Sequence, residues 1–174
     1  MEEINTIYSN QNKLLSDETI TLLNYRIQQE QYSSRIYEQI GMWFENEGLN
    51  NLAKLYKKYA EEELNHAGWA KTYLLSYDIT PSLMLLETPT NSVFWSSIKD
   101  ILDITLKHEL EVTEQCEDLT KFALTTNQFN LFTLGQKYNT EQIEEIEKAT
   151  TLVSLYERVK DDLIFDQYVG ENYL

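Results

Sequence analysis

The position of its two prolines is the feature that most limits how this chain can fold. Pro81 and Pro89 both fall within residues 78–93, and the whole chain of 174 residues has only five glycines. Proline interrupts helices, and the tight turns between strands usually need glycine or proline. With so few turn residues, the chain is expected to form long helices, because a sheet protein would need more turns.

Outside this stretch we expect an all-α fold, with four long helices and a short fifth helix near the C-terminus. Ser16 and Thr19 are candidate caps for the first helix. Residues 1–16 are expected to form an N-terminal arm, and residues 17–174 a single domain. Apolar spacing and helix breakers place the five helices at residues 18–45, 49–76, 95–126, 129–157 and 160–169.

The lengths of the connections predict the topology. The first and third connections are short, so each joins two helices into an antiparallel hairpin. The middle connection, residues 78–93, has about 16 residues and can span about 50 Å when extended. A helix of about 26 residues is only about 39 Å long. The connection can therefore run the length of the bundle, which makes helices two and three parallel and predicts a four-helix bundle with one long crossover.

Composition excludes several classes of function. The net charge of −15 disfavours nucleic-acid binding and favours either plain solubility or attraction of metal cations. Cys116 is the only cysteine, so an internal disulfide and a cysteine-based metal knuckle are both excluded. No apolar run reaches the ~18 residues that a membrane span needs. Residues 1–13 are polar and unlike a secretory signal, so a cytoplasmic location is expected.

Glu63 and His66 form the first candidate for a metal site. They lie three residues apart in the second predicted helix, and such residues share one face of a helix. Carboxylate and imidazole groups on one face can hold the same metal ion. The pair is informative because the chain has only two histidines. A single Glu-x-x-His pair occurs by chance, so its weight depends on acidic residues in the other helices.

Each of the other long helices offers a polar side chain near its middle. Glu30 lies seven residues before Tyr37 in the first helix, so both lie on one stripe of that helix. Glu109 lies close to an apolar face of the third helix. In the fourth helix, Gln142 and Glu145 are three residues apart. Di-iron carboxylate bundles use one Glu from each of two helices and Glu-x-x-His from the other two. Here the second pair reads Gln-x-x-Glu, which departs from that pattern.

Together these segments resemble a bacterial non-haem ferritin subunit over roughly residues 17–170. The matching segments are residues 29–34 with Tyr37, 62–66, 107–109 and 141–145. The resemblance implies a ferritin-like domain over residues 17–174. It also implies a hollow homo-oligomer of 24 subunits, with the short fifth helix near the four-fold axes.

The resemblance assigns iron ligands residue by residue. Glu30, Glu63 and His66 match a first iron site. Glu63, Glu109 and Glu145 match a second site, with Glu63 bridging the two ions. These five residues are therefore expected to be catalytic.

Further residues around the iron pair follow from the same resemblance. Tyr37 matches a tyrosine near the iron ions and is grouped with the catalytic residues, although a purely structural aromatic is the alternative. Gln142 matches a glutamine beside the second site. Glu62, Glu141 and Glu144 match a third iron site, which can share Glu145. Solvated helix acids are the alternative for Glu62 and Glu144. His108 is expected beside the site or at the surface, not among the ligands.

The implied function is iron storage with ferroxidase activity. Such a subunit oxidises Fe(II) with O₂ or H₂O₂ at a di-iron centre, and a ferric mineral is stored. Haem is not expected, because Leu64 stands where bacterioferritins place their haem-binding methionine. Two other readings stay open at this point: a di-iron carboxylate oxidase acting on a small substrate, and a non-catalytic helical bundle without metal.

Overall fold

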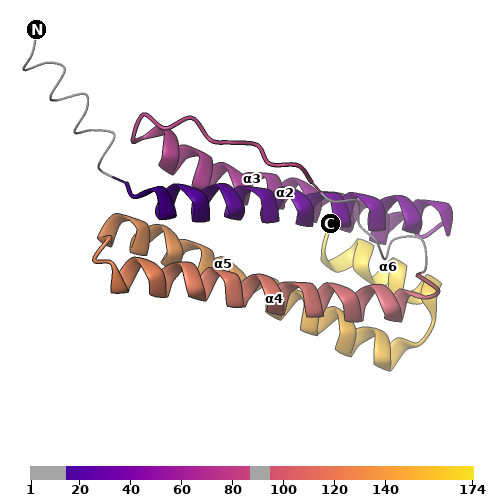
Figure 1. Cartoon of the computed structure of the whole chain (residues 1–174). Coiled ribbons are helices and arrows are strands. Elements are labelled where there is room, and N and C mark those ends of the chain that lie inside the picture. The colour runs from indigo at the N-terminus through magenta and orange to yellow at the C-terminus, as the bar shows by residue number, and fades with distance from the viewer. Residues whose placement is uncertain (1–14, 87–94) are drawn as a thin grey trace, which may run out of the picture.

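The computed structural model describes residues 15–86 and 95–174, and these residues form helices joined by loops (Figure 1). The helices are α2 (Asp17–Asn46), α3 (Asn50–Leu75), α4 (Ile98–Thr125), α5 (Phe129–Val159) and α6 (Asp162–Asn172). The described part of the chain contains no strand, which confirms the predicted all-α class. Ser16 caps α2 as predicted, since its Oγ accepts the backbone N–H of Thr19 at 3.1 Å. No helix in the described part is both long and apolar enough to cross a membrane.

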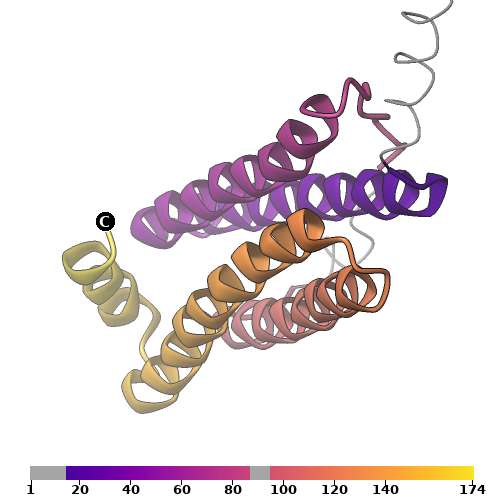
Figure 2. The same ribbon diagram turned by 90° about the vertical axis from the view of Figure 1, so that its left-hand side faces the viewer.

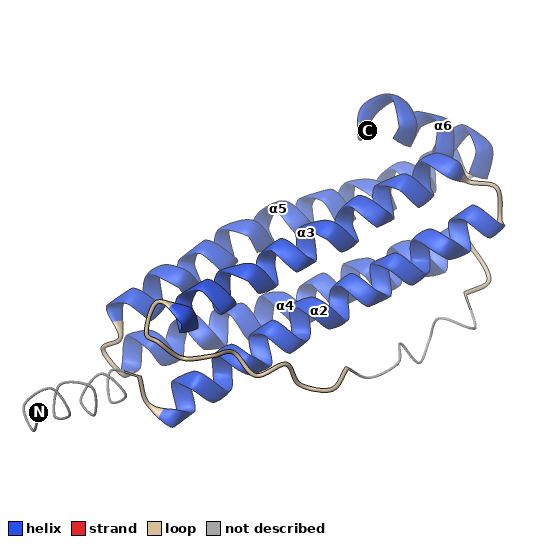
Figure 3. Cartoon of the chain, turned by 90° about the horizontal axis from the view of Figure 1, so that it is seen from above, coloured by secondary structure: helices blue, strands red, loops and turns tan. Residues whose placement is uncertain are grey.

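The four long helices pair as two hairpins, α2 with α3 and α4 with α5, and Figure 2 shows one hairpin above the other. The described part of the connection after α3, residues 76–86, runs back along the bundle, and α3 and α4 run in the same direction (Figure 3). Part of this connection lies against α2. Gln28 Nε2 donates to the Leu85 carbonyl at 2.6 Å, and the Ser82 amide donates to Asn24 Oδ1 at 2.8 Å. The predicted crossover is therefore confirmed. Pro89 and most of the predicted N-terminal arm, residues 1–16, lie outside the described residues.

The short helix α6 docks at one end of the bundle, beside the start of α3. Helix α3 has no side-chain cap of its own, and Asp166 of α6 supplies one. Its Oδ1 accepts the backbone amides of Asn51 at 3.0 Å and Leu52 at 2.8 Å. A Cβ at Gly170 would lie 2.6 Å from the Asn51 side chain, so glycine lets α6 approach this closely. A short helix that is unstable alone is therefore fixed by its contacts with α3.

Apolar packing is divided between the two ends of the bundle. One cluster, which we call the α6-end cluster, includes Phe44, Leu52 and Phe165, all with no exposed surface. The other, the loop-end cluster, includes Leu23 and Ala123. Fully buried Leu and Phe side chains each stabilise a fold by about 1.5–3 kcal/mol. Between the two clusters, the bundle interior is polar.

Candidate metal centre

A layer of buried polar side chains lies between the two apolar clusters, and every long helix contributes to it. Four of its members are carboxylic acids, which are rarely buried unless they are paired or bind a cation. We call this set the carboxylate layer. Its members and their exposed fractions are Glu30 (1%), Glu63 (3%), His66 (5%), Glu109 (2%), Gln142 (4%) and Glu145 (6%).

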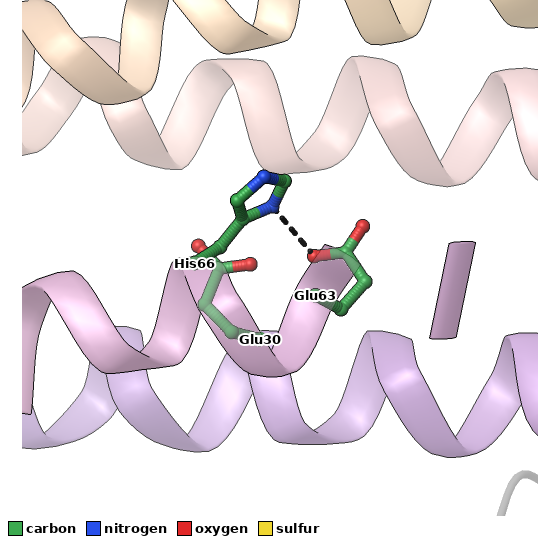
Figure 4. Close-up of side chains that lie close together, drawn as sticks. All are labelled: Glu30, Glu63 and His66. Atoms are coloured by element: carbon green, nitrogen blue, oxygen red, sulfur yellow. Dashed lines mark hydrogen bonds and ion pairs between the residues drawn. The ribbon is translucent and has the colours of Figure 1, made fainter. Parts of the chain in front are cut away.

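The first predicted ligand set is brought together in this layer. Glu30 of α2 and Glu63 and His66 of α3 each present a donor atom, and these atoms all lie within 4.8 Å of one another. His66 Nδ1 is 3.2 Å from Glu63 Oε2, and both side chains point to the same side of α3 (Figure 4). The spacing of three residues thus places the two side chains as predicted, and α2 adds the third donor.

A second close group joins α3 to α5, and it differs from the predicted second set. His66, Glu141 and Glu145 also have donor atoms within 4.8 Å of one another, with His66 Nε2 3.7 Å from Glu141 Oε1. Among the described residues these are the two groups of three that close together at this distance. Glu109 lies in the same layer, but Glu63, Glu109 and Glu145 do not form such a group.

Glu109 and Gln142 are each held by a neighbouring hydroxyl group. Tyr37 donates its hydroxyl hydrogen to Glu109 Oε1. Thr113 Oγ1 lies 3.0 Å from Gln142 Oε1 and 2.8 Å from the Glu109 carbonyl, so it links α4 to α5. Tyr37 also has its ring centroid 6.0 Å from that of His108, whose Nε2 is hydrogen-bonded to a serine of α2. His108 therefore lies beside the layer and in neither close group.

The three carboxylates of the predicted third iron site lie apart from one another, at the outer edge of the layer. Glu62 and Glu141 are half-buried, and Glu144 is exposed. Glu141 lies near His66, whereas Glu62 Oε2 lies 3.6 Å from Lys148 Nζ. The three carboxylates of this set are not one of the close groups.

Two cations in contact with the layer were not predicted from the sequence. Arg26 is 3% exposed, and its Nε lies 2.8 Å from Glu30 Oε1. Lys148 Nζ lies 2.9 Å from Glu145 Oε1. Each cation is one helical turn from its partner, at i,i+4 and i,i+3, so the sequence did carry a signal for them. Each of them lies in direct contact with one buried carboxyl group.

Burial shifts the acid–base behaviour of the layer. Desolvation, together with neighbouring carboxylates, raises the pKa of Glu30 and of Glu63 to about 8. Desolvation likewise raises the pKa of Glu109 to about 7, and it raises the pKa of Glu145. Glu30 and Glu63 therefore retain their protons at neutral pH unless a cation replaces them. Burial lowers the pKa of His108 to about 4, so its imidazole is neutral at that pH.

The donor set fits a divalent cation. Glu30 Oε2 and Glu109 Oε2 are buried and have no hydrogen-bond partner. A buried carboxylate oxygen without a partner is costly, and metal coordination removes that cost. Carboxylate oxygens with a single imidazole suit iron, and manganese or zinc can occupy the same donors.

Similarity to known proteins covers most of the chain. The family model for the ferritin-like domain matches residues 20–159. The bacterial non-heme ferritin of Escherichia coli O6:H1 is 30% identical over 132 residues, which cover 76% of this chain and 79% of that protein. Ferritin BfrB of Mycolicibacterium smegmatis is 30% identical over 142 residues, covering 82% and 77%.

Solved structures share the same bundle. An open pore ferritin from the hyperthermophilic archaeon Archaeoglobus fulgidus matches with a TM-score of 0.85. The match covers 90% of this chain and 96% of that one, at 24% sequence identity. At that identity the likeness shows the fold, and it confirms the four-helix bundle with a short C-terminal helix.

Proposed function

The chain belongs to the ferritin family of iron-storage proteins, and we propose that each subunit oxidises Fe(II) at its carboxylate layer before the iron is stored as a ferric mineral. One observation carries this proposal: Glu30, Glu63 and His66 converge in the middle of the bundle, with donor atoms within 4.8 Å of one another. Iron is here the substrate and the cargo of the protein.

We propose two iron positions that share Glu63. Glu30, Glu63 and His66 hold the first ion, and Glu63, Glu109 and Glu145 hold the second. Support for the second position comes from electrostatics, because Glu109 and Glu145 both raise the pKa of Glu63. Glu109 also keeps one buried oxygen without a partner. The close group of His66, Glu141 and Glu145 offers an adjoining set of donors on the α5 side.

The composition of the layer favours oxidation of iron. Many carboxylates and one imidazole form a hard, anionic donor set, which stabilises Fe(III) more than Fe(II). Two Fe(II) ions supply the two electrons that convert O₂ and two protons to H₂O₂, or H₂O₂ and two protons to water. The protein's part is to hold both ions at one place and to lose the carboxyl protons as the ions bind. Tyr37 positions Glu109 for this role through its hydrogen bond.

The cavity that Glu109 and Glu145 line is too small for an organic substrate. This cavity, which Tyr37 also lines, leaves about 10 Å³ for the centre of a water-sized sphere. This is room for about one water molecule. Small oxidants fit this space, whereas the small-molecule oxidase considered from the sequence would need a larger pocket.

The assembly proposed for this chain is a hollow homo-oligomer of 24 subunits, and its support is membership of the ferritin family. Light scattering of the purified protein tests it. The proposal predicts a particle of about 24 subunit masses, and a monomer or dimer would contradict it. A cytoplasmic location stays a prediction from the sequence.

Rapid mixing with Fe(II) in air tests the proposed oxidation. Replacing two ligands, in Glu63→Ala with His66→Ala, should lower the initial rate of Fe(III) formation by about 100-fold or more, because both iron positions lose a ligand. The matched control is Glu61→Ala with Asn65→Ala, which changes two exposed residues of the same helix. Rapid oxidation that survives the first double substitution would overturn the proposed site.

A further inference from the structure

The ammonium group of Lys148 lies between two carboxylates that the sequence assigned to iron. Its Nζ is 2.9 Å from Glu145 Oε1 and 3.6 Å from Glu62 Oε2. Glu62 belongs to the predicted third site, and Glu145 is the residue that this site could share. A cation of the protein itself therefore occupies the space between two of the expected donors.

This cation changes what the predicted third site can bind. A divalent ion held jointly by Glu62 and Glu145 would lie close to the ammonium and would be repelled by it. The other two members do not offer a replacement. Glu144 is exposed, and Glu141 lies near His66. The ammonium also donates a hydrogen bond to Glu145, which a third metal ion would have to displace.

We propose that Lys148 is a built-in cation at the third predicted position, so that each subunit binds two iron ions and not three. This inference rests on the proposed function, because it concerns the same carboxylates. Lys148 is thus a residue that sets the number of bound ions. It leaves the first position untouched, since Glu30, Glu63 and His66 lie on α2 and α3. It contacts only Oε1 of Glu145, so Oε2 stays available to the second position beside Glu63 and Glu109.

The position is also reachable from outside the bundle. Lys148 lines the small cavity that contains Glu109 and Glu145. It also lines an open surface groove together with Glu144 and Glu147. Its side chain is 32% exposed, so it stands in the wall between the carboxylate layer and the surface. A cation position uncovered by removing this charge would therefore be accessible to metal ions added in solution.

Calorimetric titration of the assembled, metal-free protein with Zn(II) tests the proposal, because zinc uses the same donors and is not oxidised. The unmodified protein should bind two tight ions per subunit. Lys148→Met should bind one more, because it removes the charge and keeps most of the side chain. Lys148→Arg should bind two, because it keeps the charge. Lys148→Gln provides a second neutral variant, with the same expectation as Lys148→Met.

Two controls make the result specific. Lys99→Met also frees a carboxylate, since Lys99 Nζ lies 2.7 Å from Asp103 Oδ2, and it should add no tight ion. Adding Glu62→Gln to Lys148→Met should remove the extra ion. Three tight ions in the unmodified protein, or none gained in both neutral variants, would overturn the role of Lys148 and leave the two-ion centre intact. Absence of tight binding in every variant would overturn the proposed centre, and this inference with it.

Discussion

The ends and the middle of the bundle are built from opposite chemistry. At the ends, side chains such as Phe44 and Leu23 are fully buried among other apolar groups, and their burial stabilises the fold. In the middle, Glu30, Glu63 and Glu109 are buried almost as completely, although burying a carboxylate is costly. The comparison teaches that the ends supply stability, whereas the middle gives up stability for metal binding. The two regions should therefore respond separately to mutation.

Shortening an apolar side chain at one end should produce the largest loss of stability. Phe44→Ala removes a ring with no exposed surface and should lower the free energy of unfolding by about 3–5 kcal/mol. Below the unfolding transition, the initial rate of Fe(II) oxidation per folded subunit should stay within about two-fold of the original. Chemical denaturation and rapid-mixing kinetics measure the two effects. A large fall in the rate per folded subunit would show that the ends and the middle are coupled.

The contact between Arg26 and Glu30 tests how a single ion pair in the middle of the bundle affects stability. At a pH above the Glu30 pKa of about 8, Arg26→Met leaves an ionised Glu30 buried without its cation and should lower the free energy of unfolding of the metal-free protein by about 3 kcal/mol. Arg35→Met is the matched control, because Arg35 is an exposed arginine of the same helix, and it should change stability by less than about 0.5 kcal/mol. Equal effects of the two substitutions on the free energy of unfolding, measured by denaturation, would show that the contact between Arg26 and Glu30 does not stabilise the fold.

The pH dependence of stability reports on the middle of the bundle alone, because its carboxyl groups titrate and the apolar side chains at the ends do not. In the folded, metal-free protein Glu30 and Glu63 have pKa values of about 8, against an ordinary value of 4.5. Between these values the folded state binds more protons than the unfolded state, so stability should fall as pH rises from about 5 to 8. Bound Zn(II) should reverse this trend, because metal binding needs deprotonated carboxylates.

Thermal melts of metal-free protein across this pH range test the prediction. The double variant Glu30→Gln with Glu63→Gln should show a smaller fall in melting temperature than the original chain, by several degrees (about 1 kcal/mol or more). Identical pH profiles for the two proteins would contradict the assigned pKa shifts.

The smallest effect is expected at the outer edge of the layer. Glu144 is exposed, and Glu144→Gln should change the free energy of unfolding by less than about 0.5 kcal/mol. It should also leave the initial oxidation rate unchanged, because the third predicted position does not bind iron when Lys148 is present. A clear loss of rate in this variant would restore Glu144 to the ligand set.

Most of the fold could be predicted from the sequence because it depends on local signals. Helical spacing located the four long helices, and the length of one connection predicted their directions. The pair of Glu63 and His66 was predicted for the same reason, since positions three apart share a face of a helix.

The rest of the site depends on how the helices are rotated against one another, which spacing along one helix does not determine. In the sequence, Glu141, Glu144 and Glu145 are near neighbours of similar chemistry, yet only Glu145 is buried. Arg26 and Lys148 were missed for a related reason. Each is spaced to pair with an acid of its own helix, but this spacing does not show that the acid is buried in the layer, which depends on how the helices pack.

The central claim is that the four long helices gather their acids around a pair of metal ions. Diffraction from crystals loaded with Fe(II) without oxygen, recorded at the iron absorption edge, tests it most directly. The account predicts two anomalous peaks inside each subunit, one among Glu30, Glu63 and His66 and one between Glu63, Glu109 and Glu145. Iron found only on the outer surface of the bundle, with no peak in the carboxylate layer, would contradict it.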